Sequence, residues 1–336
     1  MKPADCTSGP HGIVGPIRRR LSVCTLLRLS FISLSALFPY VLIAPLSAAS
    51  PAETPEFNIS TDVELVLLDV SVKDAKGGYV SGLTKDDFHV FESGGAQKIT
   101  VFSHSDEPIT AGLVMDASGS MQAKQADVIN AGLVFIGASN PHDQIFVVNF
   151  NDKVREGLPP EIPFSDDIRV LGKALSRDRS QGRTALNDAV AWALHHLDSG
   201  VREKKALILV SDGGDNSSQL KSDELMHLIE ESPATIYTIG IFDSDDQDKN
   251  PNVLKRIAHV SGGECFLPED YTQVVPICRR IAADIRNRYT IGYVPSRSGS
   301  SAGIRNIKVT AGSTGHEHLT VRTRSSYLLP EKQPAR

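Results

Sequence analysis

Short apolar runs alternate with segments of helical periodicity from residue 111 to residue 288, and this alternation constrains the fold more than any other feature. The run ALILV at 206–210 has no polar residue, whereas residues 186–198 place their apolar side chains on one helical face. Wholly apolar strands are typical of a parallel sheet that helices cover on both faces. We therefore predict an α/β fold with a doubly wound, mostly parallel sheet. The predicted strands span 111–115, 144–150, 206–210, 235–241 and 264–267, and the predicted helical segments include 122–138, 186–198, 250–258 and 274–285.

All-β patterns flank this segment on both sides. Residues 57–105 and 289–326 contain short alternating runs, separated by turns rich in glycine and serine. We expect the α/β domain to occupy 108–288 and the two flanks to form one small all-β domain that is discontinuous in sequence. Two independent β units fit the sequence equally well. Residues 327–336 are expected to form a loose tail.

The first 49 residues have the pattern of an export signal. Arginines at 18–20 precede an apolar stretch that ends in small residues at 47–49, as at a cleavage site. The alternative is an uncleaved membrane anchor, because 29–46 carries no charge and is barely long enough to span a bilayer. In both cases the rest of the chain is exported. We expect a periplasmic, cell-surface or secreted protein that contacts a membrane only through this anchor, if the anchor is retained.

The composition narrows the class of protein further. Of the 336 residues, 40% are hydrophobic and 22% are charged, which excludes a wholly disordered chain and a polytopic membrane protein. The formal net charge of -5 and the isoelectric point near 6.1 give no indication of nucleic-acid binding. Outside the export segment stand two cysteines, Cys265 and Cys278. They either form a disulfide, which export allows, or are two small buried residues.

Oxygen-bearing side chains follow the first strand of the α/β segment. In the sequence DASGS at 116–120, one carboxylate and two hydroxyls recur at every second position, directly before a predicted helix. Oxygen ligands of this kind suit a hard cation such as Mg²⁺. The alternative is a capping loop, in which Asp116 ends the strand and the hydroxyl of Ser118 or Ser120 caps the helix.

Two further loops lie where they would contribute to such a metal site. Thr184 stands just before a predicted helix, and Asp212 directly follows the apolar strand at 206–210. Sheets of the α/β class bind ligands at the carboxyl ends of their parallel strands. We therefore expect these two loops to lie near the DASGS loop, which favours a metal site over a capping loop.

The combination of DASGS at 116–120, Thr184 and Asp212, in this order and in these elements, resembles the von Willebrand factor type A family. The resemblance covers about 111–288 and implies a Rossmann-like fold. The flanking sequences FHVFESGGAQKITVFSHSDEP and RYTIGYVP also resemble a subgroup of exported type A proteins described in Acidobacteria.

The resemblance also implies roles for five residues, which together form the family's metal-ion-dependent adhesion site. Ser118 and Ser120 would bind the cation through their hydroxyls, and Asp116 and Asp212 would act directly or through water. Thr184 would contribute in the ligand-engaged state. The implied cation is Mg²⁺, with Mn²⁺ or Ca²⁺ as alternatives.

The expected function is metal-dependent protein binding or adhesion without catalysis. In the family, the bound cation accepts an Asp or Glu side chain of a partner protein. Two other functions remain open from the sequence. One is a metal-assisted phosphohydrolase, and the other is a structural envelope scaffold in which the metal merely stabilises the loops.

Overall fold

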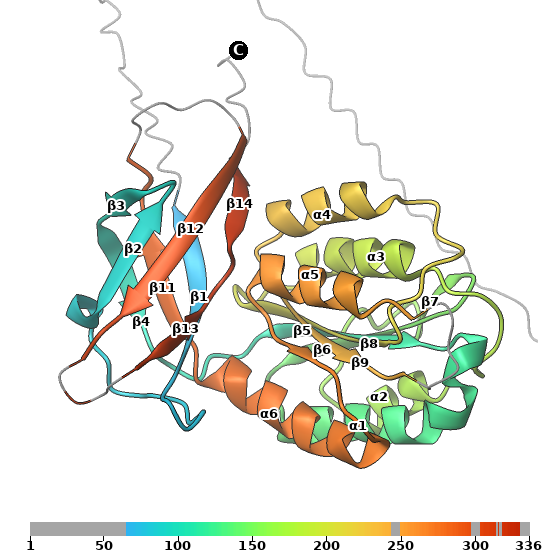
Figure 1. The fold of residues 1–336 in the computed structure, drawn as a ribbon. Helices are drawn as coiled ribbons and strands as arrows, with labels where there is room; N and C mark the ends of the chain where they lie inside the picture. The colour runs from blue at the N-terminus through green and yellow to red at the C-terminus, as the bar shows by residue number, and fades with distance from the viewer. Residues whose placement is uncertain (1–64, 243–248, 297–302, 314, 316–317, 330–336) are drawn as a thin grey trace, which may run out of the picture. The chain divides into compact units, whose positions relative to one another are not determined.

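The computed structural model describes residues 65–242, 249–296, 303–313, 315 and 318–329, which form an α/β domain and a β-sandwich (Figure 1). The predicted export segment at 1–49, the beginning of the first β segment at 57–64 and the end of the chain at 330–336 lie outside the described residues. No helix in the described part combines the length and apolarity that crossing a membrane requires.

A six-stranded sheet forms the centre of the α/β domain. Its strand order is β10-β9-β8-β5-β6-β7, and every pair is parallel except β6 with β7 at one edge. All seven residues of β5 are buried, as expected for a central strand with helices on both faces. The strands are β5 (Thr110–Asp116), β6 (Gln144–Phe150), β7 (Val154–Glu156), β8 (Lys205–Ser211), β9 (Thr235–Gly240) and β10 (Cys265–Phe266).

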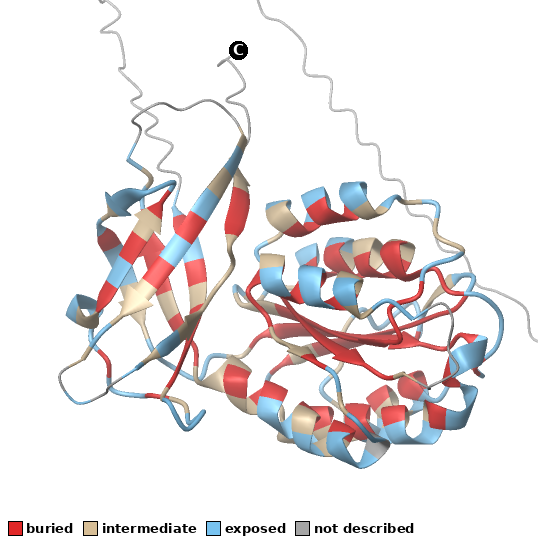
Figure 2. Cartoon of the chain, viewed as in Figure 1, coloured by how far each residue is buried: buried red, intermediate tan, exposed pale blue. Residues whose placement is uncertain are grey.

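Helices cover both faces of this sheet, so the predicted doubly wound, mostly parallel fold is confirmed. In Figure 1, α1, α2 and α6 lie on one face, and α3, α4 and α5 lie on the other. Figure 2 shows that the strands between them are almost entirely buried, whereas the helices expose their outer sides. The helices are α1 (Gln125–Ala138), α2 (Ile168–Leu175), α3 (Leu186–Asp198), α4 (Ser222–Glu231), α5 (Pro251–Ser261) and α6 (Val274–Arg286), with short 3₁₀ helices η2 (Gly119–Lys124) and η3 (Tyr271–Gln273).

Local signals fix the ends of α5. Asn250 occupies the N-cap and its side chain accepts a hydrogen bond from the Val253 N–H at 3.3 Å, while Pro251 takes the first helical position. Gly262 ends the helix in the left-handed conformation, with φ of 81°. The predicted start of this helix is therefore confirmed.

The flanking segments interleave to form the β-sandwich. One sheet has the order β13-β1-β11-β4 and the other β14-β12-β2-β3, so each contains strands from before and after the α/β domain. The two sheets share a single apolar core, and two independent β units are therefore not what the structure shows. The strands are β1 (Val66–Lys73), β2 (Phe88–Glu92), β3 (Gly95–Gln97), β4 (Ile99–Ser103), β11 (Tyr289–Tyr293), β12 (Gly303–Ala311), β13 (Thr320–Arg322) and β14 (Ser326–Leu329), with the 3₁₀ helix η1 at Lys85–Asp87.

The end of the described chain departs from the expectation of a loose tail at 327–336. Residues up to Leu329 belong to β14, which pairs with β12 in antiparallel register. Tyr327 is buried, and its hydroxyl donates a hydrogen bond to Glu92 Oε2 at 3.1 Å. The expectation is therefore wrong for 327–329. These residues are ordered because they pair with β12 and because Glu92, which is far away in the sequence, accepts the hydrogen bond of the buried Tyr327 hydroxyl. The sequence also missed α2, β3 and β7, all of them short.

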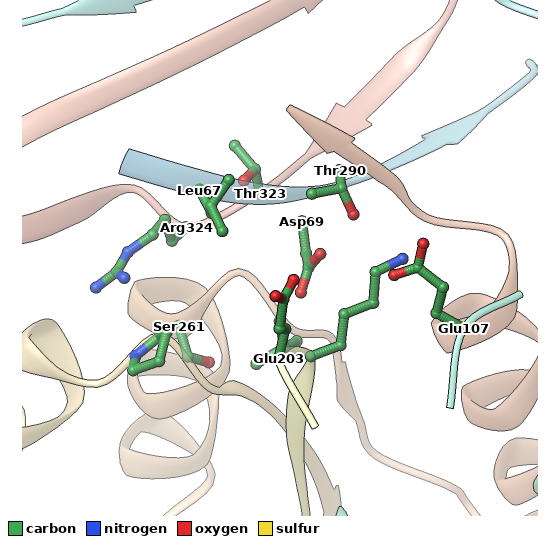
Figure 3. A pocket seen from close by; sticks show the side chains of 11 residues that line it. Leu67, Asp69, Glu107, Glu203, Ser261, Thr290, Thr323 and Arg324 are labelled. Atoms are coloured by element: carbon green, nitrogen blue, oxygen red, sulfur yellow. The ribbon is translucent and has the colours of Figure 1, made fainter. Parts of the chain in front are cut away.

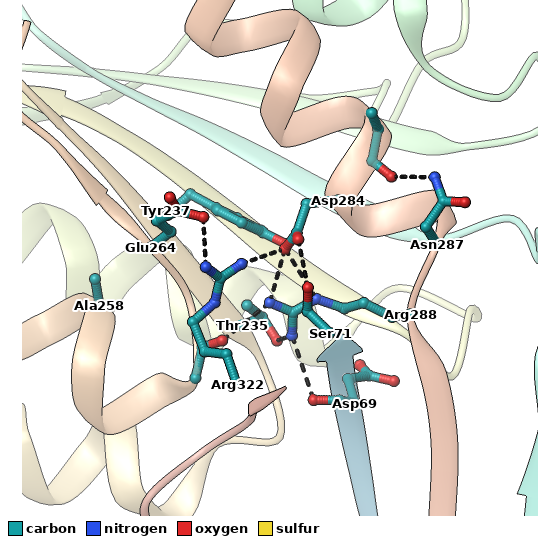
Figure 4. Close-up of polar contacts among 12 residues, drawn as sticks. Asp69, Ser71, Thr235, Tyr237, Ala258, Glu264, Asp284, Asn287, Arg288 and Arg322 are labelled. Atoms are coloured by element: carbon teal, nitrogen blue, oxygen red, sulfur yellow. Dashed lines mark hydrogen bonds and ion pairs between the residues drawn. The ribbon is translucent and has the colours of Figure 1, made fainter. Parts of the chain in front are cut away.

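A buried ionic cluster joins α6 to the β-sandwich (Figure 4). Asp284, near the end of α6, accepts hydrogen bonds from Arg288 Nη2 at 3.0 Å and from Arg322 Nη2 at 2.7 Å. Glu264 pairs with Arg322 as well, and with Lys73 Nζ at 2.9 Å. We call these five residues the interface cluster.

Neutral donors complete the environment of Asp284. The hydroxyls of Tyr237 and Ser71 donate to its two carboxylate oxygens at 2.6 and 2.7 Å. Burial raises the pKa of Asp284, but the charges of Arg288 and Arg322 together with these hydrogen bonds outweigh burial and hold the pKa well below its usual range. Asp284 is therefore ionised in the folded protein at neutral pH.

The two cysteines of the α/β domain are free thiols. Cys278 lies on the buried side of α6, and burial raises the pKa of its thiol to about 12. Of the two alternatives from the sequence, the structure shows two separate thiols.

Candidate metal centre

The candidate site lies at the carboxyl ends of two neighbouring parallel strands, β5 and β8. The strands that follow them in the chain, β6 and β9, lie on opposite sides of this pair. From β5 the chain continues to β6 on one side and later returns to β8 on the other. The loops that leave the carboxyl ends of β5 and β8 therefore diverge, which creates the crevice where α/β sheets bind ligands. β5 ends at Asp116 and β8 ends at Ser211, directly before Asp212.

Asp116 is buried and both of its carboxylate oxygens accept hydrogen bonds from neutral donors. The Ser118 N–H donates to Oδ1 at 2.8 Å, and the Ser211 hydroxyl donates to Oδ2 at 2.6 Å. Burial, followed by the negative charge of Asp212, raises the pKa of Asp116 to about 7, against the opposing effect of these hydrogen bonds. A positive charge at this point would therefore stabilise the ionised carboxylate.

Three of the other predicted residues form a chain of hydrogen bonds. Ser118 Oγ lies 3.1 Å from Ser120 Oγ, and Ser120 Oγ donates to Asp212 Oδ2 at 2.5 Å. The second oxygen of Asp212 accepts the Gly214 N–H at 2.9 Å. Asp212 and Ser118 are almost inaccessible to solvent, whereas Ser120 is exposed. One end of this oxygen-lined group is thus open to a ligand.

The capping alternative can be compared directly with the structure. Ser118 occupies the N-cap position of η2, but its side chain makes no capping hydrogen bond. Its hydroxyl contacts that of Ser120 instead. Because a capping serine uses its side-chain oxygen to accept a backbone N–H, the geometry of Ser118 does not match that role.

Thr184 lies in a loop that is bonded to the DASGS loop through the backbone. The Gly119 N–H donates to the Gly182 carbonyl at 3.1 Å, and the Gln181 N–H donates to the Ala117 carbonyl at 2.9 Å. Thr184 itself is buried, and its N–H donates to Asn216 Oδ1 at 3.0 Å. The structure thus brings all five predicted residues into three loops that are bonded to one another.

A glycine after Asp212 allows the third of these loops to pass close to α5. Gly213 has φ of 78°, and a Cβ atom added there would lie 2.4 Å from the Asn250 carbonyl oxygen. That contact and that conformation both exclude ordinary side chains. The backbone at Gly213 therefore fixes the path of the loop that carries Asp212.

Sequence reasoning missed two buried polar residues, Ser211, which contacts the site, and Lys124, which lies in the 3₁₀ helix that follows it. Ser211 donates to Asp116 from the end of the neighbouring strand, a role that its position directly before Asp212 could have indicated. Lys124 is fully buried at the end of η2, and its Nζ donates to the Ile241 carbonyl at 3.3 Å. No local pattern in the sequence distinguishes this lysine from a surface lysine.

The donor set fits a hard divalent cation. Asp116, Asp212, Ser118 and Ser120 offer only oxygen atoms, the ligands that Mg²⁺ and Ca²⁺ prefer. Throughout the described ranges, no three His, Cys, Asp or Glu side chains gather as a metal site would require, so the hydroxyls are needed to complete this one. Four such donors are fewer than the six oxygen ligands that Mg²⁺ prefers, so water or another oxygen ligand would complete the coordination of a bound cation.

Comparison with known proteins matches this region. The sequence model of the von Willebrand factor type A domain matches residues 112–279. A Synechocystis protein described as "Uncharacterized protein sll0103" is 24% identical over 210 residues, which cover 56% of this chain and 46% of that protein. The chain thus spans under half the length of this relative.

Two solved structures are also similar to this chain. A von Willebrand factor type A protein from Catenulispora acidiphila has a TM-score of 0.49 and 17% identity, covering 72% of this chain and 73% of that one. The von Willebrand factor domain of the type V pili tip protein Mfa5 from Porphyromonas gingivalis has a TM-score of 0.46 and 15% identity, covering 55% and 96%.

Proposed function

This chain belongs to the von Willebrand factor type A family, and from that premise we propose that its metal centre binds Mg²⁺ and, through the cation, an acidic side chain of a partner protein. Domains of this family in general mediate metal-dependent protein interactions or adhesion, and they are typically not enzymes. The partner is expected outside the cytoplasm, in the periplasm, at the cell surface or in the medium, because residues 1–49 predict export.

The observation that carries the proposal is the hydroxyl of Ser118. It stands at a helix N-cap without capping the helix, and it is linked through Ser120 to the carboxylate of Asp212. The side-chain oxygen atoms of Ser118, Ser120 and Asp212 therefore lie together, although the helix does not need the Ser118 hydroxyl as a cap. A bound cation would supply Lewis acidity there, and Mn²⁺ or Ca²⁺ would find the same donors.

The protein's own residues would leave such a cation electrophilic. Hydroxyl ligands carry no charge, and both oxygens of Asp116 are already engaged by the protein. An Asp or Glu carboxylate from a partner would therefore add favourable charge at the open end, beside the exposed Ser120.

Affinity capture from the native envelope tests the proposal. The full chain is used as bait in Mg²⁺ and in EDTA, beside Asp116→Ala and a control, Asp223→Ala, which removes an exposed carboxylate of α4. We expect partners that are retained by the wild type and the control in Mg²⁺ and are lost in EDTA and with Asp116→Ala. Capture that persists in EDTA and with Asp116→Ala would show that binding does not proceed through the cation.

The same samples distinguish the two other functions. A scaffold with a merely stabilising metal would gain thermal stability in Mg²⁺ without capturing a partner. A phosphohydrolase would hydrolyse a phosphate ester in a manner that Asp116→Ala abolishes. We expect neither outcome.

A further inference from the structure

A cleft at the opposite end of the parallel strands from the metal centre is too small to be a second ligand site (Figure 3). It lies beside the loops that lead into β8 and β9, and Asp69, Glu203 and Lys204 are among the residues that line it. Its volume of about 80 Å³ is well below the roughly 300–1,000 Å³ of typical small-molecule pockets. The choice of ligand is therefore better explained at the metal centre itself.

The two carboxylates of the metal centre are held in the same way. In each, one oxygen accepts the backbone N–H of the second residue after it, and the other oxygen accepts a serine hydroxyl. For Asp116 the serine is Ser211, at 2.6 Å. For Asp212 the serine is Ser120, at 2.5 Å. Both carboxylates are thus restrained before any cation binds.

The two serines differ in what else they contact. Ser120 is exposed and is itself one of the proposed ligands. Ser211 is fully buried at the end of β8 and is not a proposed ligand. Its hydroxyl oxygen also accepts the Gly213 N–H at 3.0 Å, in the loop that carries Asp212. One hydroxyl therefore connects the position of Asp116 to the path of the loop that carries the second carboxylate.

The sheet fixes the position of Ser211. Val210 and Met115 are partners in the parallel register of β8 and β5. Ser211 and Asp116 therefore occupy the next positions on these neighbouring strands. On the side of β9, the Ser211 carbonyl accepts the Ile241 N–H at 3.1 Å. Because groups built on strands are placed more exactly than groups on loops, this hydroxyl restricts the movement of the Asp116 carboxylate.

Such a restriction favours a small cation over a large one. Mg²⁺ requires near-ideal octahedral geometry with oxygen atoms at about 2.0–2.1 Å. Ca²⁺ accepts about six to eight oxygen atoms at about 2.3–2.6 Å in flexible arrangements, often with both oxygens of one carboxylate. A carboxylate whose two oxygens are already held by the protein adapts poorly to the larger ion. Loosening it should therefore harm Mg²⁺ binding more than Ca²⁺ binding.

From these observations we propose that Ser211 is a positioning residue that makes the metal centre prefer Mg²⁺ to Ca²⁺. Its hydroxyl acts through Asp116, which it holds, and through the loop that carries Asp212. This inference rests on the proposed function only in that the centre binds a cation, and it does not depend on the partner protein.

Calorimetric titration of Mg²⁺ and of Ca²⁺ into the metal-stripped full chain tests the proposal, with wild type beside Ser211→Ala. Asp116→Ala gives the background of binding elsewhere on the chain. We expect the Mg²⁺ affinity of Ser211→Ala to fall by at least about tenfold, as for other groups that orient a metal ligand. The Ca²⁺ affinity should fall much less, so the preference for Mg²⁺ should shrink.

The contrary results are distinct. Unchanged Mg²⁺ affinity in Ser211→Ala, an equal loss of affinity for both ions, or a wild type that prefers Ca²⁺ would overturn the role of Ser211 and leave the metal centre in place. No saturable binding of either ion by the wild type would overturn the metal centre, and with it both the proposed function and this inference.

Two further variants of the same residue separate the hydroxyl from the fold. Ser211→Thr keeps the hydroxyl and should keep the preference for Mg²⁺. Ser211→Cys replaces the hydroxyl by a weak donor and should behave like Ser211→Ala, so it provides the measurement if the alanine variant does not fold. A preference lost equally in the threonine and cysteine variants would overturn the proposal.

Ser261 provides a matched control at the other end of the strands. It is also a buried serine, and its hydroxyl oxygen accepts the N–H of Ile236, the second residue of β9, at 3.0 Å. Ser261→Ala should lower the Tm of the metal-free protein without changing the preference for Mg²⁺. A change in preference equal to that of Ser211→Ala would mean that the effect follows general stability, which would overturn the proposal.

Discussion

The metal centre and the interface cluster both bury carboxylates, but they satisfy them differently. In the interface cluster, Asp284 bonds to the guanidinium groups of Arg288 and Arg322, and its pKa is held below the usual range. In the metal centre, Asp116 bonds to a backbone N–H and to the Ser211 hydroxyl, and its pKa is raised to about 7. The same residue type is thus stabilised as an anion in one region and destabilised as an anion in the other.

This difference indicates what each region does. A buried carboxylate has a structural role where guanidinium groups of the same chain neutralise it. Removing one of these guanidinium groups destabilises the fold. A buried carboxylate that receives only uncharged hydrogen-bond donors has no positive charge beside it, and a cation from solution would supply that charge and stabilise the ionised form. The first region joins two domains, and the second is suited to exchange a cation with the solvent.

The largest expected effect comes from breaking the interface cluster. Arg288→Met leaves Asp284 buried with one guanidinium fewer, which should lower the free energy of unfolding by about 3–5 kcal/mol. Urea denaturation in EDTA measures this loss. Arg280→Met is the control, because that side chain is half exposed where it pairs with Glu264, and its loss should be below about 1 kcal/mol. Equal losses in the two variants would contradict the structural role of the buried pair.

The next effect concerns the pH dependence of the metal-free protein. The raised pKa of Asp116 means that the folded state holds a proton that the unfolded state has lost, so stability falls as the pH rises from about 4 through about 7. Each unit of pKa shift corresponds to about 1.4 kcal/mol, so Asp116→Asn should remove a decrease of a few kcal/mol. Thermal unfolding in EDTA between about pH 4 and about pH 8 measures the slope across this range. An unchanged slope in the variant would contradict the assignment.

The interface cluster should show the opposite sign at acid pH. The lowered pKa of Asp284 means that the unfolded state binds a proton more readily, so its contribution to stability is present above about pH 4 and is lost as the pH falls further. Asp284→Asn should be less stable than the wild type at neutral pH, and the difference should shrink in acid. A difference that stays constant down to about pH 2 would contradict the lowered pKa.

The smallest effect on stability is expected for an ion pair that is exposed to solvent. Arg256 on α5 and Asp223 on α4 lie 3.7 Å apart with both side chains more than half exposed. Arg256→Ala should change the free energy of unfolding by at most about 1 kcal/mol. Urea denaturation at low and high salt measures this change. A loss of stability comparable with that of Arg288→Met would mean that burial does not explain the difference between the exposed pair and the interface cluster.

The residues of the candidate metal centre could be predicted to lie together because they follow strand ends in short, recognisable runs. DASGS at 116–120 and Asp212 each stand directly after or at the end of an apolar strand, and parallel strands bring those ends together. The interface cluster had no such signal, since Asp284 is 213 residues from Ser71 and 38 from Arg322. Contacts at that separation depend on how the two flanks pair, which the sequence alone left open.

The sequence did not predict several short helices and strands for a related reason. α2 has only eight residues and β14 only four, so periodicity over either is too brief to stand out. The export segment, the subgroup resemblance and the choice of cation stay predictions.

Calorimetric titration of Mg²⁺ into the EDTA-stripped full chain tests the central claim most directly, with wild type beside Ser118→Ala. Because the Ser118 hydroxyl does not cap η2, the variant should unfold at the same temperature as the wild type in EDTA. The account predicts one Mg²⁺ site in the wild type and affinity weakened by at least about tenfold in Ser118→Ala, because losing a direct ligand should cost no less than losing a group that only orients one. Equal Mg²⁺ affinity in the two proteins, or no saturable binding in the wild type, would contradict it.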